Sequence, residues 1–261
     1  MRHSTVYTIL FAALICVFCG VFVSYAAVSL KERQVVNEKL DKRKKVLEAA
    51  GLIQAGEPVT AERVDELFQN IEVVAVDLRT GEEDPQVDAT EYDQEKAAGD
   101  PARSFRAEPN PSAVQRVPNH AQVFKVLDDS GQLDMLVLPI EGLGLWGTLY
   151  GFIALDSDLV TVRGLTYYRH KETPGLGGEV DNPRWKDLWP NRRLFDEQGD
   201  TALRVIKGPA GPPSEDPYKV DGLSGATLTA NGVTNMLQFW FADDLYGRYL
   251  DNLEGATRSA A

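Results

Sequence analysis

Residues 221–240 read DGLSGATLTANGVTNMLQFW and combine a small-residue turn with the start of an amphipathic helix. The apolar residues after the turn recur at the spacing of one buried helical face. They are Val233, Met236, Leu237, Trp240 and Phe241. A helix start carries unpaired N–H groups and a partial positive charge, which hold a phosphate without a cluster of basic residues. The stretch therefore predicts a helix N-terminus that suits a phosphate.

Three hydroxyl side chains stand close together in this stretch, those of Ser224, Thr227 and Thr229. The neighbouring glycines, Gly222 and Gly225, let a ligand approach the backbone closely. Ser and Thr ahead of an apolar helical run are, however, more often helix caps than ligand-binding groups. The residues alone therefore leave two interpretations open, a helix cap and a phosphate site.

The composition of the chain limits the possible classes of protein. Its 261 residues, with a net charge of −12 and 43% hydrophobic residues, suffice for one sizeable domain and an appendage. The acidic balance argues against a nucleic-acid partner, because nucleic acids are bound by basic patches. The only cysteines are Cys16 and Cys19, so neither a disulfide framework nor a cysteine metal set is predicted. The histidines His3, His120 and His170 are too scattered to indicate a metal site.

The N-terminal part is predicted to anchor the chain in a membrane. After a short tail at 1–6, residues 7–30 carry no charge and are strongly apolar, as in a transmembrane helix. A signal peptide cleaved near residues 24–26 is the alternative, but the apolar run exceeds the roughly 7–15 residues of a signal-peptide core. Residues 31–50, with a basic run at 42–45, are predicted to form a juxtamembrane helix. Charge alone leaves the topology open, because the positive-inside rule weakens before a long domain.

Residues 51–261 are predicted to form a single soluble α+β domain with a mostly antiparallel sheet and flanking helices. A helix at 60–70, with Thr60 as its N-cap, precedes a strand at 72–78. The proline-rich, acidic segment 82–119 is predicted to run over the surface without contributing to the core.

Four further strands are predicted in the middle of the chain. Residues 122–127 and 135–140 form a hairpin, and residues 149–155 continue the sheet. The strand at 159–170 has four candidate inward residues, Val160, Val162, Leu165 and Tyr167. The glycines at 142–147 indicate close strand packing, because no helix follows them as in a dinucleotide-binding loop.

The chain between this sheet and the turn is rich in loops. Residues 170–178 contain one proline and three glycines, and form a loop that either lies against a ligand or is an ordinary turn. A short amphipathic helix at 182–190 carries two tryptophans, and residues 203–208 form the last strand. The loop at 211–217 then leads into the turn.

The order Ser224-Gly225-Ala226-Thr227, preceded by Asp221-Gly222, closely resembles the flavinylation motif of the bacterial FMN-binding domain family. In that family FMN is joined by a phosphoester bond to the last threonine, here Thr227. Nearly the whole chain also resembles the C subunits of sodium-translocating NADH:quinone oxidoreductases. The similar segments are GLGLWGTLYGFIAL at 142–155, ETPGLGGEV at 172–180, PRWKDLW at 183–189 and LFDEQG at 194–199.

This resemblance implies an electron-carrier subunit of a membrane-bound, sodium-exporting NADH:ubiquinone reductase, which is not catalytic alone. Such a subunit would receive electrons from an iron–sulfur centre and pass them toward a second flavin. The covalent attachment implies maturation by a separate flavin transferase outside the cytoplasm. The soluble domain is therefore expected in the periplasm, on a single-pass anchor in a bacterial inner membrane. The implied partners are the other subunits of the respiratory complex and the transferase.

The resemblance also assigns the residues of the flavin site. Thr227 is the attachment residue, and the turn around it is shaped by Asp221, Gly222, Ser224, Gly225 and Ala226. The loop residues expected at the flavin ring are Glu172, Thr173, Leu176 and Gly177. We add Lys207 as a charge near the phosphate and Trp146 as an aromatic wall. The alternatives are an exposed strand-end lysine and, as the favoured role of the tryptophan, core packing.

Position along the turn favours Thr227 over the other two hydroxyls. Ser224 is expected to turn inward as a helix cap. Thr229 lies further into the helix, where its hydroxyl is expected to bond back to a backbone carbonyl. Thr227 follows the small residues Gly225 and Ala226, which leave room for a transferase and its flavin substrate.

Three alternative functions follow from parts of the same sequence. The G subunit of the Rnf electron-transport complex shares SGAT and a TPGLG loop, but segment 142–155 and the length of the middle segment favour the quinone reductase. A membrane-anchored serine hydrolase would pair Ser224 with His170, but no histidine follows this serine, as such enzymes require. A non-catalytic periplasmic adaptor would use the turn only as a helix cap.

Overall fold

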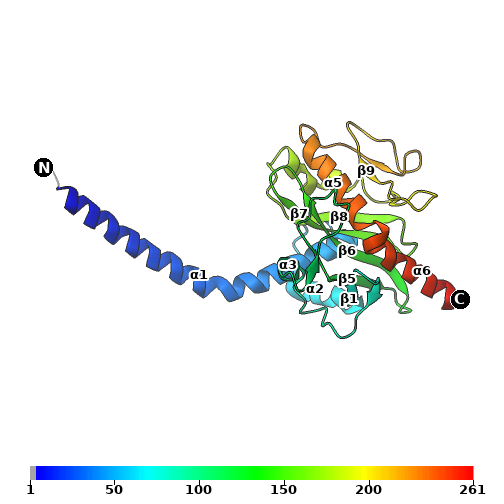
Figure 1. Cartoon of the computed structure of the whole chain (residues 1–261), viewed down its shortest axis with the longest axis horizontal. Coiled ribbons are helices and arrows are strands. Elements are labelled where there is room, and N and C mark those ends of the chain that lie inside the picture. Colours follow the sequence, from blue (N-terminus) through cyan, green and yellow to red (C-terminus); the bar gives the residue numbers. More distant parts are fainter. Residues whose placement is uncertain (1–3, 261) are drawn as a thin grey trace. The chain divides into compact units, whose positions relative to one another are not determined.

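The computed structural model describes residues 4–260 and divides into two compact units between Lys42 and Arg43. Helix α1 (Thr5–Ala49) is continuous, so the predicted transmembrane and juxtamembrane segments belong to one helix (Figure 1). Its apolar window has a mean hydropathy of 2.7 and is long enough to cross a bilayer. The predicted tail at 1–6 lies partly outside the described residues.

The last turns of α1 belong to the second unit. Val46, Leu47 and Ala49 are buried there, whereas the sequence predicts that the domain starts at residue 51. The end of α1 is therefore part of the folded domain.

The second unit is built on a six-stranded antiparallel sheet with the order β2-β1-β5-β6-β7-β8. Its strands are β1 (Ile71–Asp77), β2 (Glu82–Glu83), β5 (His120–Leu127), β6 (Leu133–Leu143), β7 (Thr148–Asp156) and β8 (Val162–Arg169). This confirms the predicted α+β class with a mostly antiparallel sheet. The hairpin of β5 and β6 pairs Phe124 with Val137, and β6 extends beyond its predicted end to Leu143.

Helix α5 packs against β6 on one face of the sheet. The chain ends with α5 (Thr227–Trp240), the helical turn η3 (Asp243–Gly247) and α6 (Arg248–Ala260) (Figure 1). All five residues predicted for the apolar face of this helix are buried, which confirms the pattern. The indole N–H of Trp240 donates to the carbonyl oxygen of Glu141 at 2.7 Å. A side chain at Gly232 would collide with the carbonyl oxygen of Leu143, so this glycine lets the helix lie directly on the strand.

The end of α1 packs on the opposite face of the sheet. Leu165 belongs to the core beneath α5, so the adjacent Thr166 points to the other side. The Thr166 hydroxyl donates to Oε1 of Glu48 in α1 at 3.0 Å. Gly164 permits this approach, because a side chain there would lie 2.5 Å from the carbonyl oxygen of Ala49. Both faces of the sheet are thus covered by helices.

The proline-rich segment 82–119 contributes to the core, so the prediction of a pure surface path is wrong. Val114 and Val117 are buried in the main hydrophobic cluster. Ser112 explains this placement, since its carbonyl and hydroxyl bond to the β6 backbone at 2.9 and 3.1 Å. The short elements of the N-terminal half are α2 (Ala61–Leu67), η1 (Phe68–Asn70), α3 (Gln94–Gly99), β3 (Ser104–Phe105) and β4 (Val117–Pro118).

Thr60 caps α2 as predicted. Its hydroxyl oxygen accepts a hydrogen bond from the Arg63 N–H at 3.3 Å, and its backbone is extended. The helix is shorter than the predicted 60–70, because the chain tightens into η1 at Phe68.

The region between β8 and α5 differs from prediction in three places. Its elements are η2 (Gly177–Asp181), α4 (Pro183–Lys186), β9 (Arg204–Val205) and β10 (Lys219–Val220). Strand β8 begins only at Val162 and leaves Val160 half-buried, because the Asp158 carboxylate accepts the Val160 N–H and bends the chain. Helix α4 is short, since Pro190 disfavours helix before it. The predicted strand 203–208 is neither long nor last: β9 covers only Arg204–Val205, the positive φ of Gly208 does not fit a strand, and β10 follows and pairs with β9 in parallel.

Candidate cofactor site

The turn before α5 leaves the start of this helix without a side-chain cap. The N-cap position is held by Ala226, which has no side-chain acceptor, and Ser224 is exposed. The predicted cap role of Ser224, and with it the cap interpretation of the turn, is therefore wrong. Gly225 adopts a φ of 71°, which favours glycine. The chain enters the helix by backbone geometry, and the first N–H groups stay open to a ligand.

Thr227, the first residue of α5, is exposed and faces a cavity. The cavity has a volume of about 350 Å³ and is also lined by Ser224, Gly225, Gly222 and Lys207. Lys207 brings a positive charge, and the helix start brings the positive end of its dipole. Together with the close backbone approach at the glycines, these features suit a phosphate group.

The loop at 170–178 lies against this turn through Leu176. A side chain at Gly225 would lie 2.9 Å from Cδ2 of Leu176, so the leucine covers the glycine. Thr173 is exposed, and its carbonyl accepts the N–H groups of Leu176 and Gly178 at 3.1 and 2.9 Å. The loop therefore places the apolar side chain of Leu176 next to the turn before α5 and exposes the Thr173 hydroxyl nearby in sequence.

Glu172 joins three segments around this region. Its Oε2 accepts from the hydroxyl of Thr229 at 2.6 Å, and its Oε1 accepts from the backbone N–H of Trp146 at 2.9 Å. The Glu172 side chain is only 6% exposed. Side chains at Gly144 or Gly177 would press on its carboxylate, so both glycines make room for it. The β6–β7 turn, the loop and α5 are thus held together by one buried carboxylate.

Two further predicted residue roles are wrong. The Thr229 hydroxyl does not bond back to a carbonyl of α5, because the Glu172 carboxylate is a stronger, charged acceptor within reach. Trp146 is not a core residue: its side chain is 65% exposed, and only its backbone is held by Glu172.

Asp221 fixes the loop that leads into the turn. Its Oδ1 accepts the N–H of Ala210 at 2.8 Å, and its carbonyl accepts the indole N–H of Trp185 at 3.0 Å. The N–H of Gly222 donates to the carbonyl oxygen of Gly208 at 2.9 Å. Asp221 therefore supports the turn and uses at least one carboxylate oxygen within the protein.

His170 is engaged on both ring nitrogens. Nε2 lies 2.8 Å from Oδ2 of Asp181, and Nδ1 accepts the N–H of Glu172 at 3.1 Å. The hydrogen bond to Asp181 raises the pKa of His170, against the opposing effect of burial. No ring nitrogen is left to activate Ser224, so the serine hydrolase lacks its base.

Large apolar side chains are exposed on the three segments that Glu172 joins. They are Leu143, Leu145, Trp146, Leu176 and Leu228. Exposed apolar groups beside a polar pocket are typical of a binding surface. The resemblance assigns Leu176 to this region, and the aromatic-wall alternative for Trp146 fits its exposure. The other three were not predicted, because they look like ordinary strand and helix residues.

The fold and this site define a class, a phosphate-accommodating α+β domain that follows an apolar helix long enough to cross a membrane. Residues 144–242 match the family described as FMN-binding domain. This range contains the β6–β7 turn, the loop at 170–178 and all of α5 with its preceding turn.

Two curated relatives cover nearly the whole chain. The C subunit of the Na(+)-translocating NADH-quinone reductase of Pseudomonas aeruginosa is 46% identical over 257 residues, which are 97% of each chain. The corresponding protein of Yersinia pestis is 43% identical over 97% of this chain and 94% of its own. The crystal structure of Shewanella oneidensis NqrC superposes with a TM-score of 0.77 and 33% identity, covering 84% of this chain and 99% of that one. The chain belongs to the family of C subunits of Na(+)-translocating NADH-quinone reductases.

Proposed function

We propose that this chain carries FMN on Thr227 through a phosphoester bond and relays electrons from an iron–sulfur centre toward a second flavin. The observation that carries this proposal is the uncapped start of α5, where the exposed Thr227 shares a cavity with Lys207. Family membership supplies the redox context, because the relatives are subunits of an NADH-quinone reductase. Bound FMN supplies reversible electron transfer, and the protein supplies attachment and a local polarity that sets the potential.

The phosphate is proposed to bind the open N–H groups of the first turn of α5. These donors have no partner within the helix and no side-chain cap, so a phosphate would satisfy them. Lys207 adds a charge on the same cavity. Gly222 and Gly225 keep side chains away from the attachment point.

The flavin ring is proposed to contact Leu176, Thr173 and Trp146. These residues offer an apolar face, a hydroxyl and an aromatic side chain, and all three are exposed. Glu172 and Gly177 are assigned a supporting role, because the Glu172 carboxylate is already bonded to Trp146 and Thr229.

The soluble domain is proposed to lie in the periplasm, at the end of a single-pass anchor in a bacterial inner membrane. We retain residues 7–30 as the span and 31–50 as the juxtamembrane helix, whose last turns pack within the FMN-binding domain of 51–261. A flavin transferase on the same side would attach the cofactor. A C-terminal alkaline phosphatase fusion should be active, and a fluorescent green fluorescent protein fusion with a dead phosphatase would contradict this placement.

The attachment is tested with full-length protein co-expressed with a flavin transferase. The wild type should give a fluorescent band on a denaturing gel, and peptide mass spectrometry should place FMN on Thr227. Thr227→Ala should be folded and colourless, whereas Ser224→Ala should retain flavin. FMN found on Ser224 or Thr229 would refute the assignment, and a wild type without flavin would refute the carrier function.

A further inference from the structure

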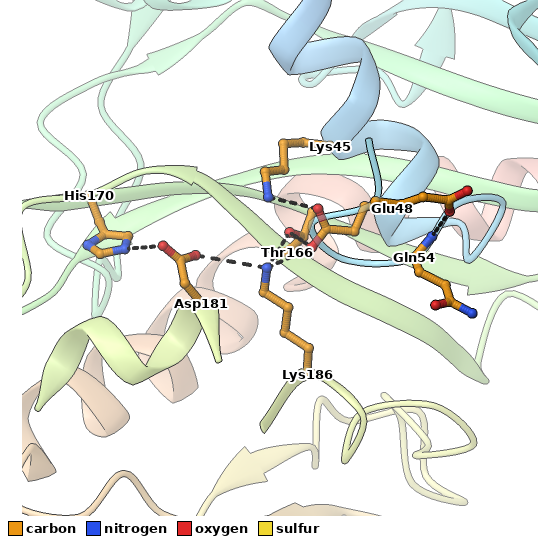
Figure 2. A network of polar contacts seen from close by, with 8 residues as sticks. Lys45, Glu48, Gln54, Thr166, His170, Asp181 and Lys186 are labelled. Carbon is orange, nitrogen blue, oxygen red and sulfur yellow. Dashed lines mark hydrogen bonds and ion pairs between the residues drawn. The ribbon is translucent and has the colours of Figure 1, made fainter. Parts of the chain in front are cut away.

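A network of polar side chains, here called the polar network, connects the end of α1 to the loop at 170–178 (Figure 2). It starts at Glu48, whose Oε1 accepts a hydrogen bond from Nζ of Lys186 at 2.7 Å. The two side chains are only 8% and 9% exposed. The Lys186 ammonium also donates to the hydroxyl of Thr166 at 3.1 Å. This buried ion pair therefore links α1, α4 and β8.

The polar network continues from α4 to Glu172, which supports the cofactor site. Nζ of Lys186 lies 3.9 Å from Oδ1 of Asp181, and Oδ2 of Asp181 lies 2.8 Å from Nε2 of His170. Nδ1 of His170 accepts the backbone N–H of Glu172. Glu172 in turn holds Thr229 of α5. Every step from Glu48 to α5 is thus a direct polar contact, and Figure 2 shows the side chains from Glu48 to His170 pointing toward one another.

The two carboxylates of the polar network, Glu48 and Asp181, keep their charge at neutral pH. Burial alone would raise the pKa of Glu48, but the hydrogen bonds from Lys186 and Lys45 lower it below its usual value. Burial likewise opposes the lowered pKa of Asp181, which results from its bond with His170 and from the charge of Lys186. The contacts of Lys186 with Glu48 and Asp181 are therefore ionic, whereas His170, whose Nδ1 accepts an N–H, holds Asp181 by a hydrogen bond.

A buried ion pair is a weak source of stability, because desolvation of the two charges offsets their attraction. Its distinctive property is geometric: it fixes which groups face one another, and it is costly to break by removing one partner. Glu48 and Lys186 are 138 residues apart in sequence, and no ordinary packing rule requires charges between α1 and α4.

We propose that Glu48, Lys186, Asp181 and His170 are positioning residues that fix the loop at 172–177 relative to the end of α1, and thereby set the environment of the flavin. The inference rests on the proposed function for its flavin readout only. The placement of the loop itself can be measured in protein with or without a flavin.

The test uses full-length protein in detergent, co-expressed with a flavin transferase, and compares Lys186→Met, Glu48→Gln and the double variant with wild type. Methionine keeps the length of the side chain without its charge, and glutamine is isosteric with glutamate. We expect backbone amides of 172–178 to exchange with deuterium roughly tenfold faster in each variant. The FMN midpoint potential should shift, while exchange in β5 and β6 stays at its wild-type rate. The double variant should change no more than either single one, because both break the same link.

Two control variants distinguish the effect of breaking the polar network from the effect of removing any charge. Arg63→Met removes an exposed ion pair with Glu66 (2.6 Å) on α2 and should change neither readout. Lys45→Met removes the second partner of Glu48 but leaves the link to Lys186 in place, so its effect should be smaller.

Wild-type exchange at 172–178 in Glu48→Gln and Lys186→Met would overturn the inference. So would faster exchange spread equally over β5 and β6, which would indicate only a less stable domain. A shifted loop with an unchanged flavin potential would also overturn it, because the flavin would then be independent of the loop. A wild type without flavin would instead refute the proposed function. The exchange measurement would then still decide whether the polar network positions the loop.

Discussion

Replacing Thr229 by valine tests whether the Glu172 carboxylate holds the cofactor region together. Valine keeps the shape of threonine but removes the hydroxyl that donates to Oε2 of Glu172 at 2.6 Å in a buried site. A hydrogen bond to a charged group contributes about 1.5–3 kcal/mol, so we expect a loss of about 2 kcal/mol in the free energy of unfolding. For a domain of this size that lowers the melting temperature by about 4–8 °C.

The assay is thermal and urea unfolding of full-length protein in detergent, followed by tryptophan fluorescence. In a Glu172→Gln background the same valine substitution should cost at least about 1 kcal/mol less, since the charged acceptor is already gone. Thr229→Ser keeps the hydroxyl and should lose only the packing of one methyl group, about 1 kcal/mol. Flavin should remain attached in Thr229→Val. Equal costs in both backgrounds would refute the role assigned to the carboxylate.

Three other perturbations test separate parts of the structure. Leu176→Glu places a charge beside the proposed ring and should shift the FMN midpoint potential without releasing the flavin; an unchanged potential would make the loop an ordinary turn. Burial, followed by repulsion from Glu95, raises the pKa of Glu141 from 4.5 to about 7, so this group costs stability as pH rises through that interval. The full shift corresponds to about 3 kcal/mol and partial exposure reduces it, so Glu141→Gln should stabilise the domain by about 2 kcal/mol at pH 8 and not at pH 4.5, as measured by thermal unfolding. Gly232→Ala should destabilise the domain by more than about 2 kcal/mol in urea unfolding, because its methyl group would meet the β6 backbone; a wild-type melt would show that α5 can move away.

The spacing of apolar residues predicts the helices and strands that bury one face, because the residues of that face recur at a fixed interval. The spacing of Val233, Met236 and Leu237 predicts α5, because the sheet covers only one side of this helix. The hairpin of β5 and β6 follows from two alternating runs and a glycine turn. These signals lie within a short stretch of chain, and they need no knowledge of the partner.

Contacts between distant segments could not be predicted in this way. Ser112 anchors its segment to the β6 backbone through bonds that leave no pattern among its own neighbours. The Glu172–Thr229 bond spans 57 residues and the Glu48–Lys186 bond spans 138. The local sequence around a charged residue with a distant buried partner does not differ from that around a charged residue exposed to water. Local patterns therefore do not distinguish the two.

The residues of the candidate cofactor site follow in part from physical reasoning and in part from the family resemblance. Physical reasoning identifies a helix start with small residues and hydroxyls, and leaves both a cap and a phosphate site open. The resemblance of the SGAT turn to a flavinylation motif selects Thr227. Only the structure reveals that Ser224 caps nothing and that Glu172 is bonded inside the protein.

The bond between Thr229 and Glu172 bears on the order in which the protein matures. In an unfolded chain, Ser224, Thr227 and Thr229 are three alcohols on one short peptide, equally open to a transferase. Folding sequesters the Thr229 hydroxyl in a bond to a buried carboxylate. Under the proposed attachment, folding before modification would remove Thr229 as a competitor of Thr227, whereas the exposed Ser224 would have to be excluded by the transferase itself.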